Sequence, residues 1–420
     1  MSFDTISVIG LGYIGLPTAV MFALRHPNVV GVDLDRSLVE AINQGEMTVT
    51  EPDLARLTRM AVAQGFLRAT HRPMAADAFL IAVPTPLQGD HQPDLTFVQM
   101  AARGLADVLK PGDLVVLEST SPVGTTEQLA EWLALARPDL SFPQQRGEQS
   151  DVRIAYCPER VLPGNIMQEL ARNDRVIGGM TERCAARACE LYRIFLEGEC
   201  MVTDTRTAEM CKLTENSFRD VNLAFANELS LICAEQGIDV WALIRLANRH
   251  PRVDILLPGP GVGGHCIAVD PWFIVSQHPR QAQLIHTARL VNDAKPLWVV
   301  DRVKIAVADA LAQSGKTPKS LCIACFGLTF KPDIDDCRGS PALDITAMIA
   351  EWHAGKTLVV EPYLPELPPI LRGCAVPADI RQALRDADVL VMLVDHQAFR
   401  AVPAEQIAQR WVVDTRGIWR

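Results

Sequence analysis

Short, mainly apolar runs bounded by turn residues alternate with helical patterns through the first part of the chain. Four of these runs have the length of strands: Ile6–Ile9, Val29–Val32, Ala78–Val83 and Leu114–Leu117. Runs that are apolar at nearly every position are typical of strands covered on both faces of a parallel sheet. Since an apolar helical pattern over 16–24 follows the first run, the order of elements predicts a doubly wound α/β domain.

A different pattern begins at about Asp204. A long helix is predicted over Thr207–Gln236, and its largely apolar neighbours lead us to expect that it is buried between domains with its polar face internal. A second helix, roughly Gln281–Ala312, contains Pro296, which should bend or break it. These two segments predict a central domain built from helices.

Strand patterns return in the last part of the chain. The expected elements are four strands and a helix: Leu321–Gly327, Thr357–Val360, Val389–Val394 and Trp411–Asp414, with the helix over Ala342–Trp352. The predicted fold is therefore α/β, with two Rossmann-like doubly wound domains joined by a central helical domain. The expected boundaries are 1–203, 204–300 and 301–420.

Composition narrows the class of protein. Hydrophobic residues make up 49% of the 420 residues and charged residues 21%, which is typical of a globular protein. No apolar run approaches the roughly 18 residues of a membrane span, and no basic segment opens the chain, so we expect neither a membrane helix nor a signal peptide. A net charge of −10 argues against nucleic acid as a partner, but local Lys and Arg could still bind an anionic small molecule.

The cysteines predict a reducing environment. There are 11 of them, an odd number in a large chain without a secretion signal, so we expect a cytoplasmic protein. Cys322 and Cys325 have CxxC spacing, but strand geometry would send their side chains to opposite faces. We therefore predict no metal site.

A dinucleotide fingerprint follows the first strand. Gly10, Gly12 and Gly15 form a GxGxxG turn that leads into a helix, and Asp33 ends the second predicted strand. The glycines permit a tight turn close to a pyrophosphate, and the acid binds the ribose hydroxyls. Because Asp33 would repel a 2′-phosphate, the pattern favours NAD over NADP, although the nearby Arg36 weakens this preference.

Three polar residues follow later strands of the same predicted sheet. Thr85, Thr120 and Glu159 come directly or soon after buried runs. Ligands of doubly wound sheets bind beyond the carboxyl ends of the strands. We therefore expect these residues in a crevice where the nicotinamide and the substrate meet, although a lone acid such as Glu159 is more often a surface or cap residue.

The glycine-rich stretch Gly261–Pro271 contains a cysteine, Cys266, and a carboxylate, Asp270. Glycines let the backbone approach a ligand closely, so a thiol there is well placed to attack a carbon. The alternative is an ordinary buried cysteine. On the long predicted helix, Lys212 and Asn216 share one face, and a buried pair of this kind could hold an oxyanion.

Basic residues mark the loops of the last domain. Lys331, Arg338 and Arg416 are expected at the ends of its strands, where they would suit the phosphates of a nucleotide. Each of them alone could also be a plain surface charge.

Seven motifs lie in order along the chain: GLGYIGLP from Gly10, ESTSPVGT from Glu118, YCPER from Tyr156, KLTENSFRDVN from Lys212, NRHPRV from Asn248, GVGGHCIAVDP from Gly261 and FGLTFKPDIDDCR from Phe326. With them, the chain resembles the UDP-glucose/GDP-mannose dehydrogenase family over its whole length. Ala268 stands where much of the family has proline, and Gly339 where it often has glutamate. With His265 before the cysteine and NRHPRV upstream, the chain is most similar to the branch that oxidises UDP-N-acetyl-hexosamines. Within this branch it most resembles the enzyme that supplies the uronic acid of enterobacterial common antigen.

This resemblance implies an N-terminal NAD domain, a helical middle that forms a homodimer, and a C-terminal domain that holds the UDP group. It also implies a four-electron oxidation that converts C6 of the sugar from an alcohol to a carboxylate while two NAD are reduced. The implied substrate is UDP-N-acetyl-D-mannosamine. UDP-N-acetylglucosamine or another UDP-hexose stays open, because a single stereocentre is read by the shape of the pocket.

Roles carried over from the family fall on matching positions. Cys266 would be the nucleophile, Lys212 and Asn216 would steady the C6 oxygen, and Asp270, Glu159 and Thr120 would handle protons and water. The implied cofactor-binding residues are Gly10, Gly12, Tyr13, Ile14, Gly15, Asp33, Arg36, Thr85, Thr120 and Arg338. The implied substrate-binding residues are Glu159, Arg160, Val161, Lys212, Asn216, His250, Arg252, Gly263, Lys331 and Arg416, with Arg252 reaching the sugar site of the second subunit.

Two other interpretations of the residues stay open. A two-electron dehydrogenase of the hydroxyacid type would share the glycine turn and a Lys/Asn pair on a helix, and Cys266 would then be a packing residue. A non-catalytic sensor of NAD or of a nucleotide sugar would use the same pockets without turnover.

Overall fold

The computed structural model describes residues 3–46, 51, 53–161 and 164–419. The chain divides into two compact units, one made of 1–215 with 272–277 and the other of 216–271 with 278–420. We describe each unit by itself, and the three-domain division expected from the sequence stays a prediction.

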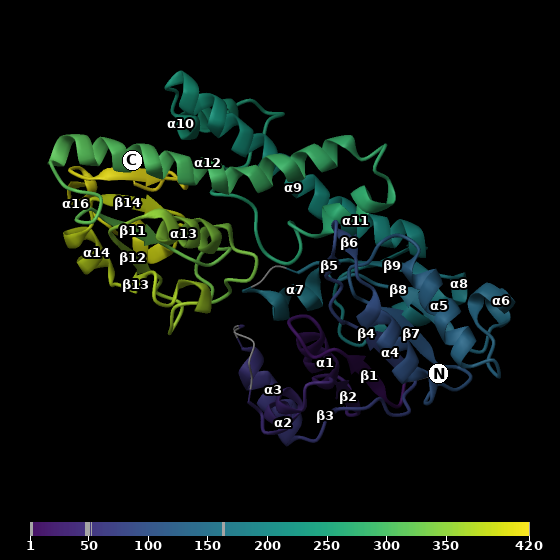
Figure 1. Cartoon of the computed structure of the whole chain (residues 1–420). Coiled ribbons are helices and arrows are strands. Elements are labelled where there is room, and N and C mark those ends of the chain that lie inside the picture. Colours follow the sequence, from purple (N-terminus) through teal and green to yellow (C-terminus); the bar gives the residue numbers. More distant parts are fainter. Residues whose placement is uncertain (1–2, 47–50, 52, 162–163, 420) are drawn as a thin grey trace. The chain divides into compact units, whose positions relative to one another are not determined.

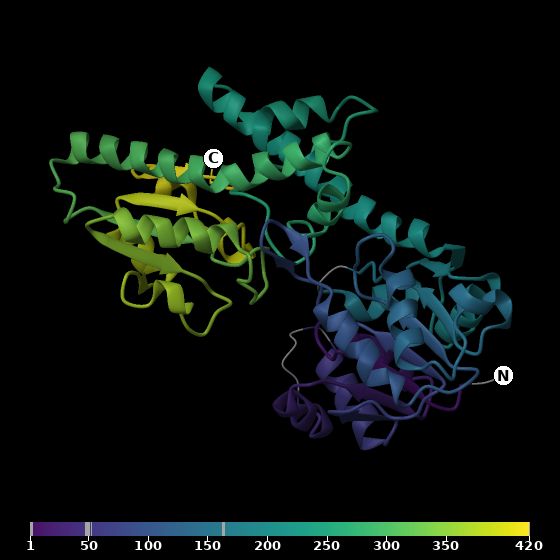
Figure 2. The same ribbon diagram turned by 45° about the vertical axis from the view of Figure 1, so that its right-hand side comes forward.

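An eight-stranded sheet forms the centre of the first unit (Figures 1 and 2), with the strand order β10-β9-β8-β7-β4-β1-β2-β3. Its strands are β1 (Ile6–Ile9), β2 (Val29–Val32), β3 (Leu67–Thr70), β4 (Ala78–Ile81), β7 (Leu114–Leu117), β8 (Arg153–Tyr156), β9 (Arg175–Gly179) and β10 (Cys200–Asp204). Neighbouring strands are parallel except for β8 and β9. A short hairpin, β5 (Leu87–Gln88) and β6 (Gln92–Pro93), follows β4.

Helices cover both faces of this sheet, because its strands are apolar on both sides. Along β4, Leu80 points into one core and Phe79 into the other. The first core is formed with α1 (Gly15–Ala23), α3 (Leu54–Ala63), α7 (Ile166–Arg172) and α8 (Glu182–Tyr192), and the second with α4 (Thr96–Ala106) and α5 (Thr125–Ala136). Helix α2 (Arg36–Asn43) and the short α6 (Pro143–Arg146) complete the unit.

The second unit contains a five-stranded parallel sheet with the order β13-β12-β11-β14-β15. Its strands are β11 (Cys322–Phe326), β12 (Lys356–Val360), β13 (Val376–Pro377), β14 (Val389–Met392) and β15 (Trp411–Asp414). One face packs against α12 (Gln283–Ser314) and α13 (Pro341–Trp352), and the other against α14 (Ile380–Asp386), α15 (Gln397–Arg400) and α16 (Ala404–Ile407). Cys325 and Cys322 point into these two different cores, as strand geometry predicted.

Three further helices carry parts of the candidate site. Helix α9 (Thr205–Gln236) begins in the first unit and continues in the second, while α10 (Val240–Ala247) and α11 (Asp270–Gln277) follow it along the chain. The parallel sheets at both ends and these helices confirm the predicted α/β fold class with a helical central region.

The structure corrects two expectations about the long helices, the break of α12 at Pro296 and the full burial of α9. Helix α12 runs without a break through Pro296, whose ring lies close to Gly261. Helix α9 is not buried all round: Phe218, Phe225 and Ile232 on it are exposed. Half of its ten buried positions are polar, among them Glu209, Asp220 and Asn227, so the helix does turn polar side chains inward, while the expectation of full burial is wrong.

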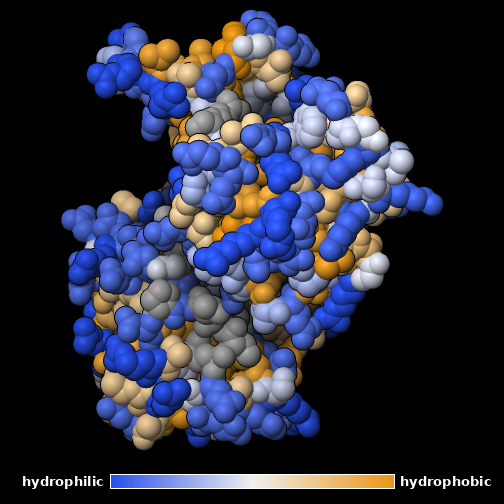
Figure 3. Space-filling view, turned by 90° about the vertical axis from the view of Figure 1, so that its left-hand side faces the viewer, coloured by the Kyte–Doolittle hydropathy of each residue, from blue (hydrophilic) through white to orange (hydrophobic). Residues whose placement is uncertain are grey.

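Among the described residues, no helix combines the length and the apolar character that crossing a bilayer requires. Within the same ranges, no group of three or more His, Cys, Asp and Glu side chains could hold a metal ion. On the face drawn in Figure 3, hydrophilic side chains predominate and apolar side chains reach the surface in separate groups.

Candidate active site

The glycine turn after β1 is closed as tightly as its sequence predicts. Gly10 has φ of +87°, and a Cβ on Gly15 would lie 1.8 Å from the Gly10 carbonyl oxygen. Asp33, at the end of β2, accepts a hydrogen bond from the backbone N–H of Leu11 at 2.8 Å. A Cβ on Gly12 would meet no atom within 4 Å, so the turn faces open space. A close-lying pyrophosphate and a ribose beside Asp33 therefore fit this turn.

The other predicted cofactor residues lie around this turn and at neighbouring strand ends. The Tyr13 hydroxyl donates to Glu51 Oε1 at 2.6 Å, and Ile14 directly precedes α1. Arg36 is exposed at the start of α2. The structure therefore leaves the Arg36 side chain in contact with solvent rather than packed against the core.

Thr85 and Thr120 are brought together at the ends of β4 and β7. The Thr85 hydroxyl donates to the carbonyl oxygen of Thr120 at 2.6 Å. This bond joins the two loops at the carboxyl edge of the sheet, which is where ligands of this fold bind.

Glu159 is buried, which makes it different from an ordinary acid after a strand. Its Oε2 accepts a hydrogen bond from Arg175 Nη2 at 2.8 Å, and its Oε1 accepts the backbone N–H of Arg160 at 2.7 Å. The Arg175 side chain is only 4% exposed and also lies 3.9 Å from Glu118. Burial raises the pKa of Glu118 to about 7, and Tyr192 donates to it at 2.6 Å.

Sequence reasoning missed this Arg175 cluster. Arg175 is the first residue of an apolar strand, and no motif near it in the sequence indicates that it pairs with Glu118 and Glu159. The neighbouring Arg160 pairs through its side chain with Glu215 at 2.7 Å, and Val161 packs half-buried against the core. Glu159 is thus held as one member of a buried ion pair with a fixed orientation.

Within the second unit, Asn216, Asp270 and Cys266 come together. The Asn216 amide donates a hydrogen bond to Asp270 Oδ2, and the Asp270 N–H donates to the Cys266 carbonyl at 2.8 Å. Asp270 is buried at the start of α11, whereas Cys266 is exposed. Lys212 is half-buried one turn before Asn216 on α9 and, like Thr120 and Glu159, belongs to the first unit.

The glycines of the cysteine stretch pack against the loop that follows β11. A Cβ on Gly263 would lie 2.3 Å from the Gly339 carbonyl oxygen, and the Gly264 N–H donates to the same oxygen at 3.3 Å. Gly339 itself has φ of +59°, a conformation that glycine adopts without strain. Gly339, one of the two departures from the family pattern, therefore suits the backbone conformation that it adopts.

A polar contact between side chains adds to this packing. His265 Nε2 lies 3.4 Å from Asp336 Oδ2, and Asp336 also binds the exposed Arg338 through two hydrogen bonds of 2.9 and 2.7 Å. The motifs around Cys266 and Arg338, far apart in the sequence, therefore form one structural piece of the second unit.

The remaining predicted substrate residues lie on loops. His250 and Arg252 are exposed after α10, and the Arg252 N–H donates to His250 Nδ1 at 3.3 Å. Lys331 follows β11 and is half-buried, and Arg416 follows β15 and pairs with Asp395 at 2.7 Å. In this single chain, His250 and Arg252 are not brought to the other predicted residues by any contact described above.

The sequence also did not predict the stacking of His91 on Trp272. His91, at the tip of the β5–β6 hairpin, stacks on Trp272 with ring centroids 3.8 Å apart. The hairpin therefore packs against Trp272–Gln277, the part of α11 that belongs to the same unit.

Comparisons with known proteins agree with these motifs. The UDP-glucose/GDP-mannose dehydrogenase family models match residues 4–196 (NAD binding domain), 206–294 (central domain) and 324–420 (UDP binding domain). The chain is 69% identical, over the full length of both chains, to a UDP-N-acetyl-D-mannosamine dehydrogenase from Yersinia pestis. It is 59% identical to an NDP-N-acetyl-D-galactosaminuronic acid dehydrogenase from Ralstonia nicotianae, covering 100% of this chain and 97% of the relative.

A solved structure shares the fold. A UDP-D-ManNAc dehydrogenase from Pyrococcus horikoshii superposes with a TM-score of 0.88 at 37% identity, covering 99% of this chain and 96% of the other. The match to the family's NAD binding domain confirms the prediction of NAD as the cofactor.

Proposed function

Because the chain belongs to the UDP-glucose/GDP-mannose dehydrogenase family, we propose that it oxidises UDP-N-acetyl-D-mannosamine at C6 to the uronate, with NAD as the oxidant. The observation that carries the choice of sugar is the 69% identity over the full length to an enzyme named for it. Balanced, the reaction consumes one alcohol, one water and two NAD, and it yields one carboxylate, two NADH and three protons.

The glycine turn and Asp33 would hold the cofactor, which accepts hydride when bound. The first oxidation gives an aldehyde, which has no second hydride to give until a nucleophile adds to its carbon. We assign this addition to Cys266, which is exposed on a glycine-rich stretch. Its sulfur adds to C6 to form a thiohemiacetal, and oxidation of that adduct leaves a thioester on Cys266.

Hydrolysis then releases the acid. Water adds to the thioester carbon, the C–S bond breaks, and the sulfur leaves as the thiolate. We assign the proton transfer to Asp270, and this is supported by its burial, by its hydrogen bond from Asn216 and by the hydrogen bond of its N–H to the Cys266 carbonyl. Lys212 and Asn216 would steady the C6 oxygen, and charge stabilisation of this kind is worth about a hundred- to a thousandfold in rate.

Glu159 and Thr120 would position the water. The buried Arg175 and the Arg160 N–H each bind one oxygen of the Glu159 carboxylate, so this group is oriented before any substrate arrives. Arg175 therefore supports the proposed role of Glu159 although it was not part of the predicted site.

An assay of NADH yield tests the proposal. Purified protein should reduce two NAD per UDP-N-acetyl-D-mannosamine, and Cys266→Ser should lose the four-electron turnover, since serine forms an ester in place of the thioester. One NADH per sugar would indicate a two-electron dehydrogenase, and no turnover of any UDP-sugar would favour the sensor.

The same assay with epimers tests the sugar. UDP-N-acetylglucosamine and UDP-N-acetylgalactosamine should be poorer substrates by kcat/KM. The galactosamine sugar is the second candidate, because the relative at 59% identity is named for the corresponding uronic acid. A higher kcat/KM for either of these sugars would replace the proposed substrate and keep the chemistry.

We further propose a homodimer formed by the central helices. On α9, Phe218, Phe225 and Ile232 are exposed and recur about every two helical turns, so they form one apolar stripe. On α12, Leu290 and Leu297 are exposed at a similar interval. Apolar stripes of this kind mark interaction surfaces. In such a dimer, Arg252 of each chain would complete the sugar site of the other.

We also propose that the protein works in the cytoplasm. Cys157, Cys184 and Cys233 are buried and none of the three forms a disulfide. Reduced, buried thiols are typical of proteins in a reducing compartment.

A further inference from the structure

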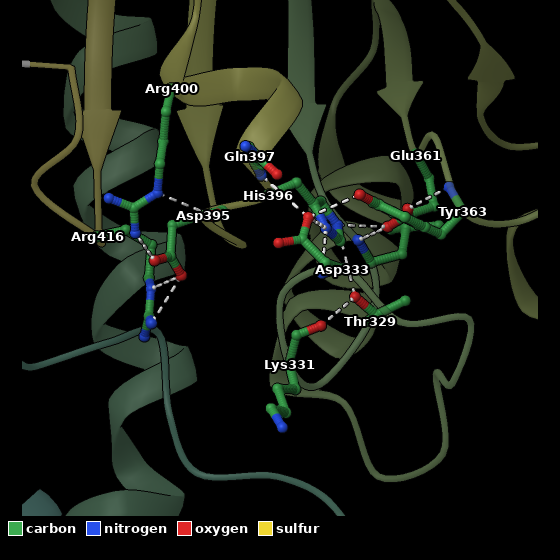
Figure 4. Close-up of polar contacts among 11 residues, drawn as sticks. Thr329, Lys331, Asp333, Glu361, Tyr363, Asp395, His396, Gln397, Arg400 and Arg416 are labelled. Carbon is green, nitrogen blue, oxygen red and sulfur yellow. Dashed lines mark hydrogen bonds and ion pairs between the residues drawn. The ribbon is translucent and has the colours of Figure 1, made fainter. Parts of the chain in front are cut away.

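Two loops meet where the strand order of the second sheet reverses. Strands β11 and β14 are neighbours in the order β13-β12-β11-β14-β15, and their connections run in opposite directions from that point. Open α/β sheets bind ligands in the crevice beyond the carboxyl ends of such a pair. The loop after β11 contains Lys331, and the turn after β14 contains Asp395 and His396 (Figure 4).

His396 organises the first of these loops. Its side chain is fully buried, and Nδ1 accepts a hydrogen bond from the Asp333 N–H at 2.9 Å. Because Nδ1 is an acceptor, the ring proton lies on Nε2, which is 3.2 Å from Glu361 Oε2. The Thr329 hydroxyl donates to the Lys331 carbonyl at 2.8 Å and lies 3.5 Å from His396 Nε2. The loop that carries Lys331 is therefore folded around the imidazole.

Asp333 shows how firmly this loop is held. It has φ of +60°, a conformation that costs energy for a residue other than glycine. Its carboxylate accepts hydrogen bonds from the Tyr363 hydroxyl at 2.7 Å and the Gln397 N–H at 3.0 Å. Gln397, the residue after His396, thus helps to hold the loop that contains Lys331 in this strained conformation.

Asp395 orients Arg416, the second basic side chain at this edge of the sheet. Its Oδ1 lies 2.7 Å from both Nε and Nη2 of Arg416, and its Oδ2 binds Arg400. A Cβ on Gly259 would lie 2.6 Å from Arg416 Nη1, so the glycine leaves room for the guanidinium. Figure 4 shows the Lys331 side chain extending away from the His396 cluster.

We propose that Asp395 and His396 are positioning residues for the diphosphate of the nucleotide-sugar substrate. His396 fixes the backbone that carries Lys331, and Asp395 fixes the guanidinium of Arg416. Two adjacent residues of one turn therefore set the geometry of both cations. The inference rests on the proposed function, because it takes Lys331 and Arg416 as the groups that bind the substrate phosphates.

The test compares KM for the UDP-sugar with kcat and with KM for NAD. His396→Leu should raise KM for the UDP-sugar by roughly 10- to 100-fold, a range typical of misplaced binding groups, and leave KM for NAD unchanged. His396→Asn should recover part of the loss, because its side-chain oxygen can accept the Asp333 N–H in place of Nδ1. Equal rises in both KM values, or no rise, would overturn the role of His396.

A matched control separates positioning from folding. His353 is also a buried histidine of this unit, and its Nε2 binds the Leu321 carbonyl at 3.0 Å at the opposite edge of the sheet. His353→Leu should lower the thermal unfolding temperature without changing KM for the UDP-sugar. If it changes KM as much as His396→Leu does, the effect is one of stability and the inference is wrong.

Asp395 is tested through its coupling to Arg416. Asp395→Asn should raise KM for the UDP-sugar by about 10-fold in the parent chain, and by less than about twofold when Arg416→Ala is already present, because coupled residues are not additive. Additive effects would contradict the inference. If the proposed function is wrong, the parent protein itself will not turn over a UDP-sugar, whereas failure of this inference alone leaves the parent active and the variants unchanged.

Discussion

Lys295 is an unusual lysine, because only 3% of it is exposed. Its ammonium binds the Ser230 hydroxyl and lies 3.9 Å from the centre of the Trp298 ring. Burial lowers the pKa of Lys295 from 10.5 to about 7. Between about pH 7 and pH 10.5 the unfolded chain binds a proton that the folded chain does not, so stability rises with pH through this window and is lost as the pH falls toward 7.

Lys295→Met should therefore stabilise the protein at pH 7, and the gain should shrink toward pH 10. A thermal unfolding series across this range measures it. Lys304→Met is the control, since Lys304 lies on the same helix and its side chain is 52% exposed. A gain for Lys295→Met that does not change with pH would show that the burial of this charge is not its cause.

At the scale of elements, buried polar contacts between α9 and α12, which we call the polar seam, join the two helices. Asp220 and Arg289 form a buried pair at 2.6 Å, and Asn227 and Asn292 bond to each other at 2.9 Å. Removing one member of a buried pair leaves a charge without compensation and typically costs about 3–5 kcal/mol. The cost should lie toward the lower end here, because Arg289 also binds Asp293.

Asp220→Ala should accordingly shift the urea unfolding midpoint of this helical region to lower concentration. Asp301→Ala removes an exposed partner of Lys304 on α12 and should have little effect. Equal shifts for the two variants would mean that the seam contributes no more than a surface pair does.

The strands and helices could be predicted where a local pattern determines them. The apolar run at Ala78–Ile81 predicted β4 correctly, because a strand that is covered on both faces of the sheet is apolar at every position. The break at Pro296 was wrong because a missing N–H is tolerated inside a long helix that packs along its length. The burial of α9 was wrong because periodicity does not say whether an apolar stripe faces the core of its own chain or a second copy.

For the whole molecule, the prediction concerns assembly. Phe225→Asp should convert the proposed dimer to a monomer, as measured by light scattering, because it places a charge in the apolar stripe of α9, where Phe225 is 51% exposed. The monomer should lose most activity if Arg252 acts on the second chain. Leu135→Asp, at a position 82% exposed on α5, should keep both the dimer and the activity. A fully active monomer would contradict the exchange of Arg252.

The candidate site could be predicted only in part for a related reason. Gly10, Asp33 and Cys266 could be singled out from the sequence because each lies in a short local motif. The pairs that orient the site join residues far apart in the sequence, such as Arg175 with Glu159 and Arg416 with Asp395. Spacing does not reveal such pairs, and they became visible only when the sheets placed the strand ends side by side.

The exposure of Cys266 also has a consequence for redox chemistry. Cys266 and Cys374 are the cysteines classed as exposed, whereas burial raises the pKa of Cys157 and Cys325 to about 12 and keeps these thiols unreactive. Peroxide should therefore react with Cys266, the proposed nucleophile, before it reaches the buried thiols, and the resulting sulfenic acid can be returned to the thiol by reductants. If Cys266 has the proposed role, the activity of the purified protein should fall on treatment with peroxide and recover on addition of a thiol reductant.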